Sequence, residues 1–92
     1  MRQKLQKYAK NMGTDILLQP QDARYENMKG NWHSNFFHNQ NPIVLELACG
    51  KGEYTTGLAT HFPERNYIGV DIKGDRIQTG IRYAHENNLK NV

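Results

Sequence analysis

Hydrophobic positions in this sequence gather after Pro42, in two short apolar runs separated by a segment of helical period. The first run, residues 43–47, is almost continuously aliphatic and has the length of a strand covered on both faces of a parallel sheet. We expect it to be a central strand, entered through the Asn-Pro turn before it. Residues 67–71 form the second run and predict a second buried strand.

The segment between these runs predicts a helix over residues 53–61, which Pro63 ends. Units of strand, helix and strand join parallel strands through a right-handed crossover in nearly all known cases, so the two strands should be parallel. One face of the predicted helix carries its apolar residues: Tyr54, Leu58, Ala59 and Phe62.

A second helix is expected to open over residues 73–75, with Asp75 as its cap. Gly80 costs this helix about 1 kcal/mol of propensity and indicates close backbone packing against the sheet. The buried stripe of the helix is expected to contain Ile77, Ile81, Ala84 and Leu89.

The alternation of elements predicts an α/β fold, the amino-terminal half of a Rossmann-like domain with parallel strands and helices on both faces. The sequence reaches Asn91 and Val92 where the next strand of this pattern would begin. Two strands leave hydrogen-bonding edges open and bury little area, so we expect a fragment, truncated before the third strand.

The first forty residues carry weaker signals. We expect residues 1–28 to be a basic, flexible amino-terminal arm, with a short helix over residues 3–11, and residues 29–92 to be the incomplete α/β domain. Trp32, Phe36 and Phe37 have helical spacing, which favours a short helix packed on the domain over an aromatic platform for stacking bases.

Composition narrows the class of protein. Ninety-two residues make one small domain, with 37% hydrophobic residues, a mean hydropathy of -0.85 and a net charge of +3. A single cysteine excludes an internal disulfide and suits a reducing cytoplasm. The four histidines show no metal-ligand spacing, and no apolar run approaches the roughly 20 residues of a membrane span. We therefore expect a cytoplasmic protein without metal.

Basic residues crowd the first ten positions, with no acidic residue among them. Such an arm attracts polyanions, although a solvated terminus explains the same pattern. The residues concerned are Arg2, Lys4, Lys7 and Lys10.

The strongest candidate for chemistry is the segment from Glu46 to Gly52, which follows the first strand, combined with Asp71 at the end of the second. Ligands bind open parallel sheets at the carboxyl ends of strands, and an acidic residue about 20 positions beyond a glycine turn meets ribose hydroxyls. Asp71 lies 21 positions after Gly50. The order and spacing together predict a nucleoside-binding site.

The glycine spacing discriminates between cofactors. A dinucleotide fingerprint needs G-x-G-x-x-G, whereas this turn has Ala48, Gly50 and Gly52, and the carboxylate of Glu53 would repel a diphosphate. The pattern suits a ligand with an amino-acid end and a nucleoside end. Glu46 can attract the ammonium, Gly50 and Gly52 leave space, and Asp71 can hold the ribose hydroxyls. Lys51 is either an anion contact or a solvated loop residue, and Cys49 is expected to be packed rather than nucleophilic.

Three segments make the sequence resemble the bacterial tRNA (guanine-N7) methyltransferase family. They are KGNWHSNFF at residues 29–37, NPIVLELACGKGEYTTGLA at residues 41–59 and FPERNYIGVDIKGDR at residues 62–76. The resemblance implies transfer of a methyl group from S-adenosyl-L-methionine to N7 of a guanine in tRNA, and no membrane partner. It also implies that Glu46 and Asp71 match the family's cofactor-binding acids, and that Gly50 and Gly52 match its glycine loop.

Guanine N7 is a lone-pair nucleophile with no proton to remove, so the reaction needs alignment rather than a general base. The resemblance places the guanine-binding residues beyond Val92, so we expect no catalytic residue in this chain, which alone should be inactive. Ala48 stands where the family usually has a glycine, and it is strained if the turn needs positive φ.

Two other functions are weighed against this hypothesis. One is a non-catalytic RNA-binding or assembly module on a methyltransferase scaffold, suggested by the basic start and the short chain. The other is an NAD-dependent oxidoreductase of Rossmann type, which the missing third glycine disfavours.

Overall fold

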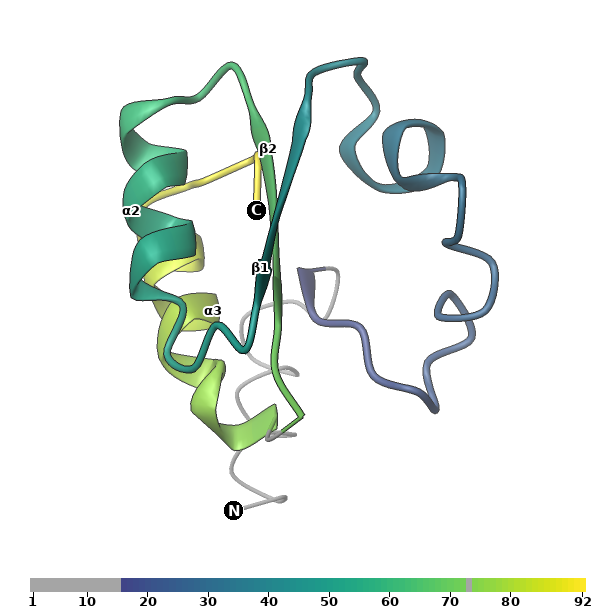
Figure 1. Ribbon diagram of the computed structural model, residues 1–92, viewed down its shortest axis with the longest axis horizontal. Helices are drawn as coiled ribbons and strands as arrows, with labels where there is room; N and C mark the ends of the chain where they lie inside the picture. The colour runs from purple at the N-terminus through teal and green to yellow at the C-terminus, as the bar shows by residue number, and fades with distance from the viewer. Residues whose placement is uncertain (1–15, 73) are drawn as a thin grey trace.

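The computed structural model describes residues 16–72 and 74–92, and the basic residues of the first ten positions, the expected helix over residues 3–11 and Lys73 lie outside this part. In chain order the elements are a π-helix η2 (Trp32–Phe37), strand β1 (Ile43–Leu47), helix α2 (Glu53–His61), strand β2 (Asn66–Val70), a 3-10 helix η3 (Gly74–Arg76) and helix α3 (Gln78–Glu86). Both α-helices lie on one side of the two strands, and residues 16–41, which include η2, lie on the other (Figure 1).

The two strands pair in parallel, as predicted, with Ile43 opposite Asn66 and Leu47 opposite Val70. The pairing continues past β1, where the N–H of Cys49 donates to the Val70 carbonyl at 2.9 Å. Strand β2 begins and ends one residue earlier than predicted, so that Asp71 is the first residue after it.

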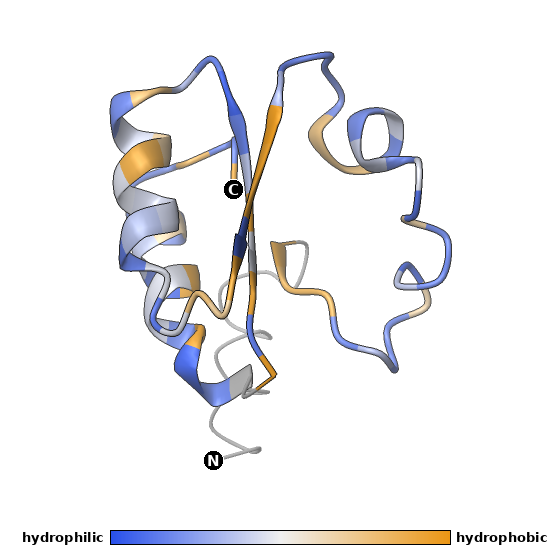
Figure 2. Ribbon diagram, viewed as in Figure 1, coloured by the Kyte–Doolittle hydropathy of each residue, from blue (hydrophilic) through white to orange (hydrophobic). Residues whose placement is uncertain are grey.

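The sheet of the described residues contains only β1 and β2, so β1 lies at an edge there and the prediction of a central strand is not met. Leu45 and Leu47, expected to be covered, are 54% and 72% exposed. Figure 2 shows the hydrophobic character of β1, interrupted in its middle by a polar position. The exposed leucines leave β1 with apolar surface of the kind that a neighbouring strand or helix covers.

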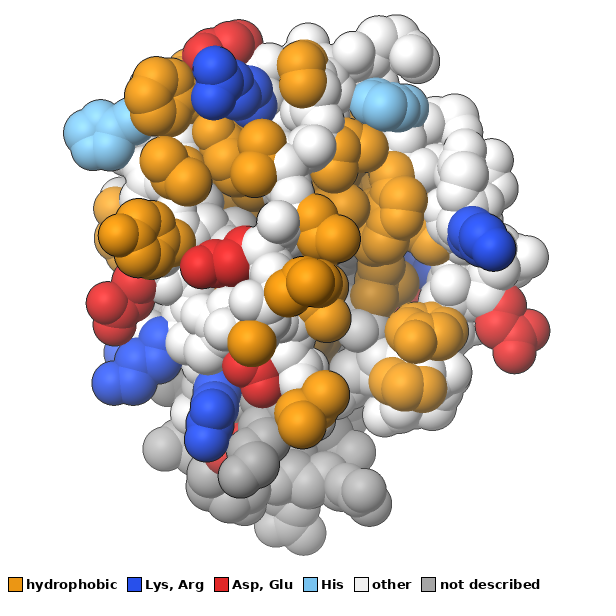
Figure 3. All heavy atoms as spheres, viewed as in Figure 1, with side chains coloured by type: hydrophobic (Ala, Val, Ile, Leu, Met, Phe, Trp, Pro, Cys, Tyr) orange, Lys and Arg blue, Asp and Glu red, His pale blue; other side chains and the backbone are white. Residues whose placement is uncertain are grey.

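Helix α2 has the predicted bounds but not the predicted buried face. Its buried residues are Thr55, Thr56 and Ala59, whereas Tyr54 is 76% exposed and Phe62, just after the helix, is 40% exposed. Of the predicted apolar face only Ala59 is buried, because the helix approaches β2 through small side chains. Hydrophobic side chains cover much of the face seen in Figure 3, over the sheet and α2.

Helix α3 begins later than predicted. The 3-10 turn η3 contains Asp75, and Ile77 occupies the N-cap position without a side-chain hydrogen bond, so the prediction of Asp75 as the cap is wrong. Of the predicted stripe, Ile81 and Ala84 are buried, whereas Ile77 is half-buried before the helix and Leu89 lies beyond its end. Ile81 forms a small core with Leu17, so residues before η2 contribute to the same packed body.

The aromatic cluster forms the short helix that its spacing predicts. Within η2, the rings of Trp32 and Phe36 meet edge to face at 5.6 Å between centroids, and Phe37 is buried. The loop before it is held by Arg24, whose guanidinium contacts the Asp22 carboxylate at 2.8 Å and the Leu17 carbonyl at 3.1 Å. This segment therefore has its own polar connections to the core.

Asn91 closes the corner between α2 and β2. Its amide nitrogen lies 3.1, 3.4 and 2.9 Å from the carbonyl oxygens of Ala59, Phe62 and Arg65. The backbone carbonyl of Asn91 accepts a hydrogen bond from the backbone N–H of Tyr67 at 2.7 Å. Since alternate residues of a strand bond to opposite sides and the N–H of Asn66 donates to Pro42, this contact lies on the edge of β2 away from β1.

None of the helices in the described ranges combines the length and the hydropathy that crossing a bilayer requires.

Candidate functional site

The two segments singled out by the sequence meet at one end of the sheet. Because β1 and β2 are parallel, the glycine turn (residues 48–52) and Asp71 follow the carboxyl ends of neighbouring strands. The loop into α2 and the segment after β2 lie together at this end (Figure 1). The N–H of Gly50 donates to the Asp71 carboxylate at 2.9 Å, which joins the two segments directly.

The glycine turn uses the left-handed backbone region three times. Ala48, Gly50 and Gly52 have φ angles of 55°, 58° and 75°, and the N–H of Gly52 donates to the Cys49 carbonyl at 2.9 Å. Glycine adopts these angles without steric cost, whereas the Cβ of Ala48 costs roughly 1–2 kcal/mol. The strain that the sequence associates with positive φ at Ala48 is therefore present.

Glu46 lies on β1 opposite Gly69 and is half-buried. Its carboxylate accepts a hydrogen bond from the hydroxyl of Thr55, in the first turn of α2. A Cβ at position 69 would lie 2.9 Å from the Cys49 sulfur and 3.3 Å from the Thr55 hydroxyl oxygen, so glycine is needed there. Sequence reasoning missed Thr55 and Gly69, because neither belongs to a glycine or acidic motif.

The thiol of Cys49 is close enough to both Glu46 and Asp71 for their charges to act on it. Burial, followed by the nearby charges of Glu46 and Asp71, raises the pKa of its thiol. A raised pKa keeps the sulfur protonated and weakly nucleophilic, in agreement with the prediction of a packed residue.

Gly80 of α3 packs directly under the glycine turn. A Cβ at this position would lie 2.9 Å from the Lys51 carbonyl oxygen and 3.6 Å from the Gly52 Cα. The expected close approach is present, but its partner is the turn rather than the sheet. Helix α3 thus packs against the backbone of the turn through Gly80.

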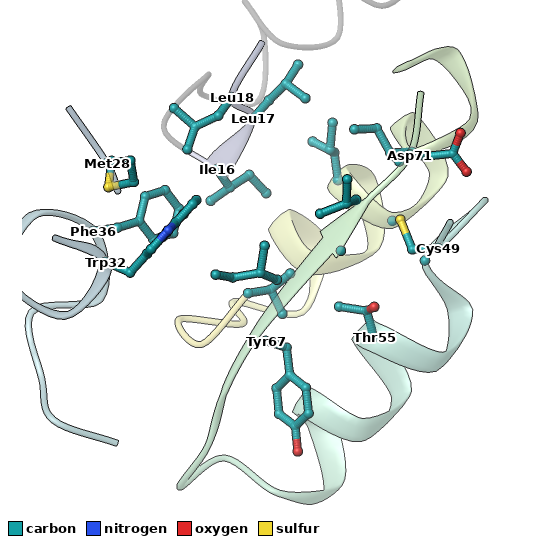
Figure 4. Close-up of a pocket in the computed structure, with 18 of the residues that line it drawn as sticks. Ile16, Leu17, Leu18, Met28, Trp32, Phe36, Cys49, Thr55, Tyr67 and Asp71 are labelled. Atoms are coloured by element: carbon teal, nitrogen blue, oxygen red, sulfur yellow. The ribbon is translucent and has the colours of Figure 1, made fainter. Parts of the chain in front are cut away.

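A cavity of about 820 Å³ flanks β2 on both sides. Its walls include the aromatic residues of η2 and, across β2, Thr55 and Ile81. Figure 4 shows the rings of Trp32 and Phe36 facing the strand, while the Asp71 side chain points away from them. The carboxylates of Glu46 and Asp71 therefore lie beside the glycine turn at the carboxyl end of the sheet, which we call the rim. They are separate from the apolar part of this cavity.

No cluster of three or more His, Cys, Asp or Glu side chains within residues 16–72 and 74–92 is arranged to hold a metal ion.

Comparison with known proteins connects this rim to a family. A sequence model of a protein family described as "Putative methyltransferase" matches residues 40–92, which contain both strands, the glycine turn and Asp71. The chain belongs to this methyltransferase family. Its fold is the amino-terminal, α/β part of the family's Rossmann-like domain.

Curated relatives agree with the family match. The tRNA (guanine-N(7)-)-methyltransferase of Porphyromonas gingivalis is 50% identical over 76 residues, covering 83% of this chain and 31% of the relative. That of Cytophaga hutchinsonii is 48% identical over 91 residues, covering 99% and 41%. That of Bacteroides fragilis is 58% identical over 65 residues, covering 71% and 26%. The chain thus spans between about a quarter and two fifths of the length of these relatives.

Proposed function

We propose that this chain is the amino-terminal part of an enzyme that methylates N7 of guanine in tRNA, with S-adenosyl-L-methionine as the methyl donor. The names of the relatives and the family match support the reaction. The observation that carries the cofactor assignment is the hydrogen bond between Gly50 and Asp71, which brings the glycine turn and the acidic strand end to one rim. The single cysteine and the tRNA substrate suit a cytoplasmic location.

The donor groups at the rim fit such a cofactor. Glu46 supplies a carboxylate for the ammonium of the amino-acid end, and Asp71 supplies one for the ribose hydroxyls. A carboxylate offers about four acceptor positions, so Asp71 can keep the Gly50 N–H and accept further hydrogen bonds. A Cβ at Gly50 would meet nothing within 4 Å, so the turn leaves open space beside these acids.

When bound, S-adenosyl-L-methionine supplies an electrophilic methyl group on its sulfonium. The residues of this chain bind and orient, because guanine N7 offers a lone pair and requires no base. The carboxylates of Glu46 and Asp71 favour a cationic ligand over a dinucleotide diphosphate, which argues against the NAD-dependent alternative. We assign no catalytic residue to this chain and place the guanine-binding residues in the remainder of the protein.

The same proposal covers the domain organisation. Residues 29–92 form the first strand-helix-strand-helix part of the cofactor domain, and a third strand continues from Asn91 along the outer edge of β2. The bond between the Tyr67 N–H and the Asn91 carbonyl supports this placement, and so does the cavity on both sides of β2. Within residues 1–28, the basic residues of the first ten positions contact tRNA phosphates in this proposal, whereas Leu17 and Met28 are buried against the domain.

The test uses the full-length protein, calorimetric titration with S-adenosylhomocysteine and a methyl-transfer assay on unmodified tRNA. Asp71→Ala is expected to weaken binding by about 1–3 kcal/mol, because a hydrogen-bonded carboxylate is lost from the site. The control is Glu64→Ala, an exposed acid in the turn before β2, which should bind normally. Tighter binding of NAD, or tRNA binding without methyl transfer, would contradict the proposal.

A further inference from the structure

A buried threonine contacts the proposed ammonium-binding acid. Thr55 is the third residue of α2 and is 4% exposed, although its side chain carries a hydroxyl. Buried hydroxyl groups need a hydrogen-bond partner, and the partner of Thr55 is the carboxylate of Glu46. The contact joins the first turn of α2 to β1 across nine residues of sequence.

The other threonines of α2 behave differently. The hydroxyls of Thr56 and Thr60 both donate to the backbone carbonyl four residues earlier, at 2.8 Å in each case. This is the usual way for a helical threonine to satisfy its hydroxyl locally. Thr55 instead donates outside the helix, so its hydroxyl depends on the register between α2 and β1.

The neighbouring strand β2 leaves space for the contact between Thr55 and Glu46. Position 69, opposite Glu46 in the sheet, is a glycine, and a Cβ there would come within 3.3 Å of the Thr55 hydroxyl oxygen. The space for the threonine therefore depends on a missing side chain in β2. Glu46 and Thr55 thus form one polar contact between β1 and α2, and Gly69 of β2 leaves the space for it.

We infer that Thr55 is a positioning residue, which holds the Glu46 carboxylate in place to receive the ammonium of the methyl donor. This inference rests on the proposed function. A glutamate side chain has several rotamers, and fixing them costs conformational entropy when a ligand binds. Because the Thr55 hydroxyl already restrains one carboxylate oxygen, less of this cost falls on binding.

The experiment compares Thr55→Val with Thr55→Ser in the full-length protein, by titration with S-adenosylhomocysteine. Valine keeps the shape but removes the hydroxyl, so affinity should fall about tenfold, because binding must then supply the cost of ordering the Glu46 side chain. Serine keeps the hydroxyl and should restore most of the affinity. In methyl transfer, the KM for the donor should rise while kcat changes little, because Thr55 touches no reacting atom.

Thr60→Val is the matched control, since it removes a hydroxyl of the same helix that donates to the Thr56 backbone carbonyl and not to Glu46 or the glycine turn. It should leave the dissociation constant unchanged. If Thr55→Val fails to fold, Thr55→Ala removes the same hydroxyl without adding a methyl group and replaces it in every comparison.

A double-mutant cycle decides whether Thr55 acts through Glu46. In a Glu46→Ala background, the loss of the Thr55 hydroxyl should have no further effect on affinity. An undiminished tenfold loss there, or wild-type affinity in the single Thr55 variant, overturns the role of Thr55 and leaves the proposed function standing. Failure of the wild-type protein to bind either S-adenosyl-L-methionine or S-adenosylhomocysteine overturns the proposed function together with this role.

Discussion

Replacing Gly80 with alanine tests the contact between α3 and the glycine turn. A Cβ at this position would lie 2.9 Å from the backbone oxygen of Lys51, closer than real Cβ atoms approach such a group. The substitution should gain about 1 kcal/mol of helix propensity and lose about 1–3 kcal/mol to overpacking. The expected net effect is a loss of between zero and about 2 kcal/mol in the free energy of unfolding.

Gly57 provides the matched control, because it is also a helical glycine but a Cβ there would meet nothing within 4 Å. Gly57→Ala should gain the propensity alone and stabilise the protein by about 1 kcal/mol. The difference between the two variants isolates the steric contact and should be about 1–3 kcal/mol. Urea unfolding of the full-length protein, followed by circular dichroism, measures both values.

Displacement of the Lys51 peptide should also disturb the glycine turn, so Gly80→Ala should weaken S-adenosylhomocysteine binding while Gly57→Ala should not. Equal stabilisation by the two alanines would refute the packing of α3 against the turn. A destabilised Gly80→Ala variant with unchanged affinity would show that the contact between α3 and the turn stabilises the fold without affecting ligand binding.

Three further variants test the rim and the opposite, amino end of the sheet. Ala48→Gly should raise stability by about 0.5–1 kcal/mol in thermal unfolding, since relief of the left-handed strain exceeds the entropic cost of glycine; a lower melting temperature would contradict this. Cys49 should react with iodoacetamide more slowly than a free cysteine at pH 8, because its thiol pKa is raised. Asp71→Asn should lower this pKa and speed the reaction, and an unaltered rate would argue against the electrostatic cause. Asn66→Ala should cost about 2 kcal/mol, because the fully buried amide donates to Asn39 at 2.8 Å; a loss below about 0.5 kcal/mol in urea unfolding would show that this bond contributes little.

The sequence predicted the features that depend on chain order and period. Two aliphatic runs around a helical segment imply parallel strands, and parallel strands bring the glycine turn and Asp71 to one end of the sheet. This juxtaposition is present, with a direct hydrogen bond between Gly50 and Asp71. The short helix at Trp32 was also predictable, because aromatic spacing is a local property.

The features that sequence reasoning missed depend on which surfaces meet. Tyr54 and Leu58 have the spacing of a buried stripe, yet the buried residues of α2 include Thr55 and Thr56. Their hydroxyls donate to Glu46 of β1 and to the Gly52 carbonyl. Asp75 has the chemistry of a cap, but a 3-10 turn delays the start of α3. Burial preferences predict neither outcome, because a polar residue with a satisfied hydrogen bond can replace an apolar one.

The corner bound by Asn91 limits how the loop before it can vary. Surface loops usually tolerate insertions and deletions because their ends can adjust. Here the amide of Asn91 binds three carbonyls, while the next residue, Val92, lines the cavity. The number of residues after the end of α3 at Glu86 therefore decides which side chain reaches the carbonyls and which reaches the cavity. Residues 87–90 can therefore change in identity far more freely than in number. Deleting one of them would place Val92 where Asn91 binds the three carbonyls, and inserting one would place Asn91 where Val92 lines the cavity.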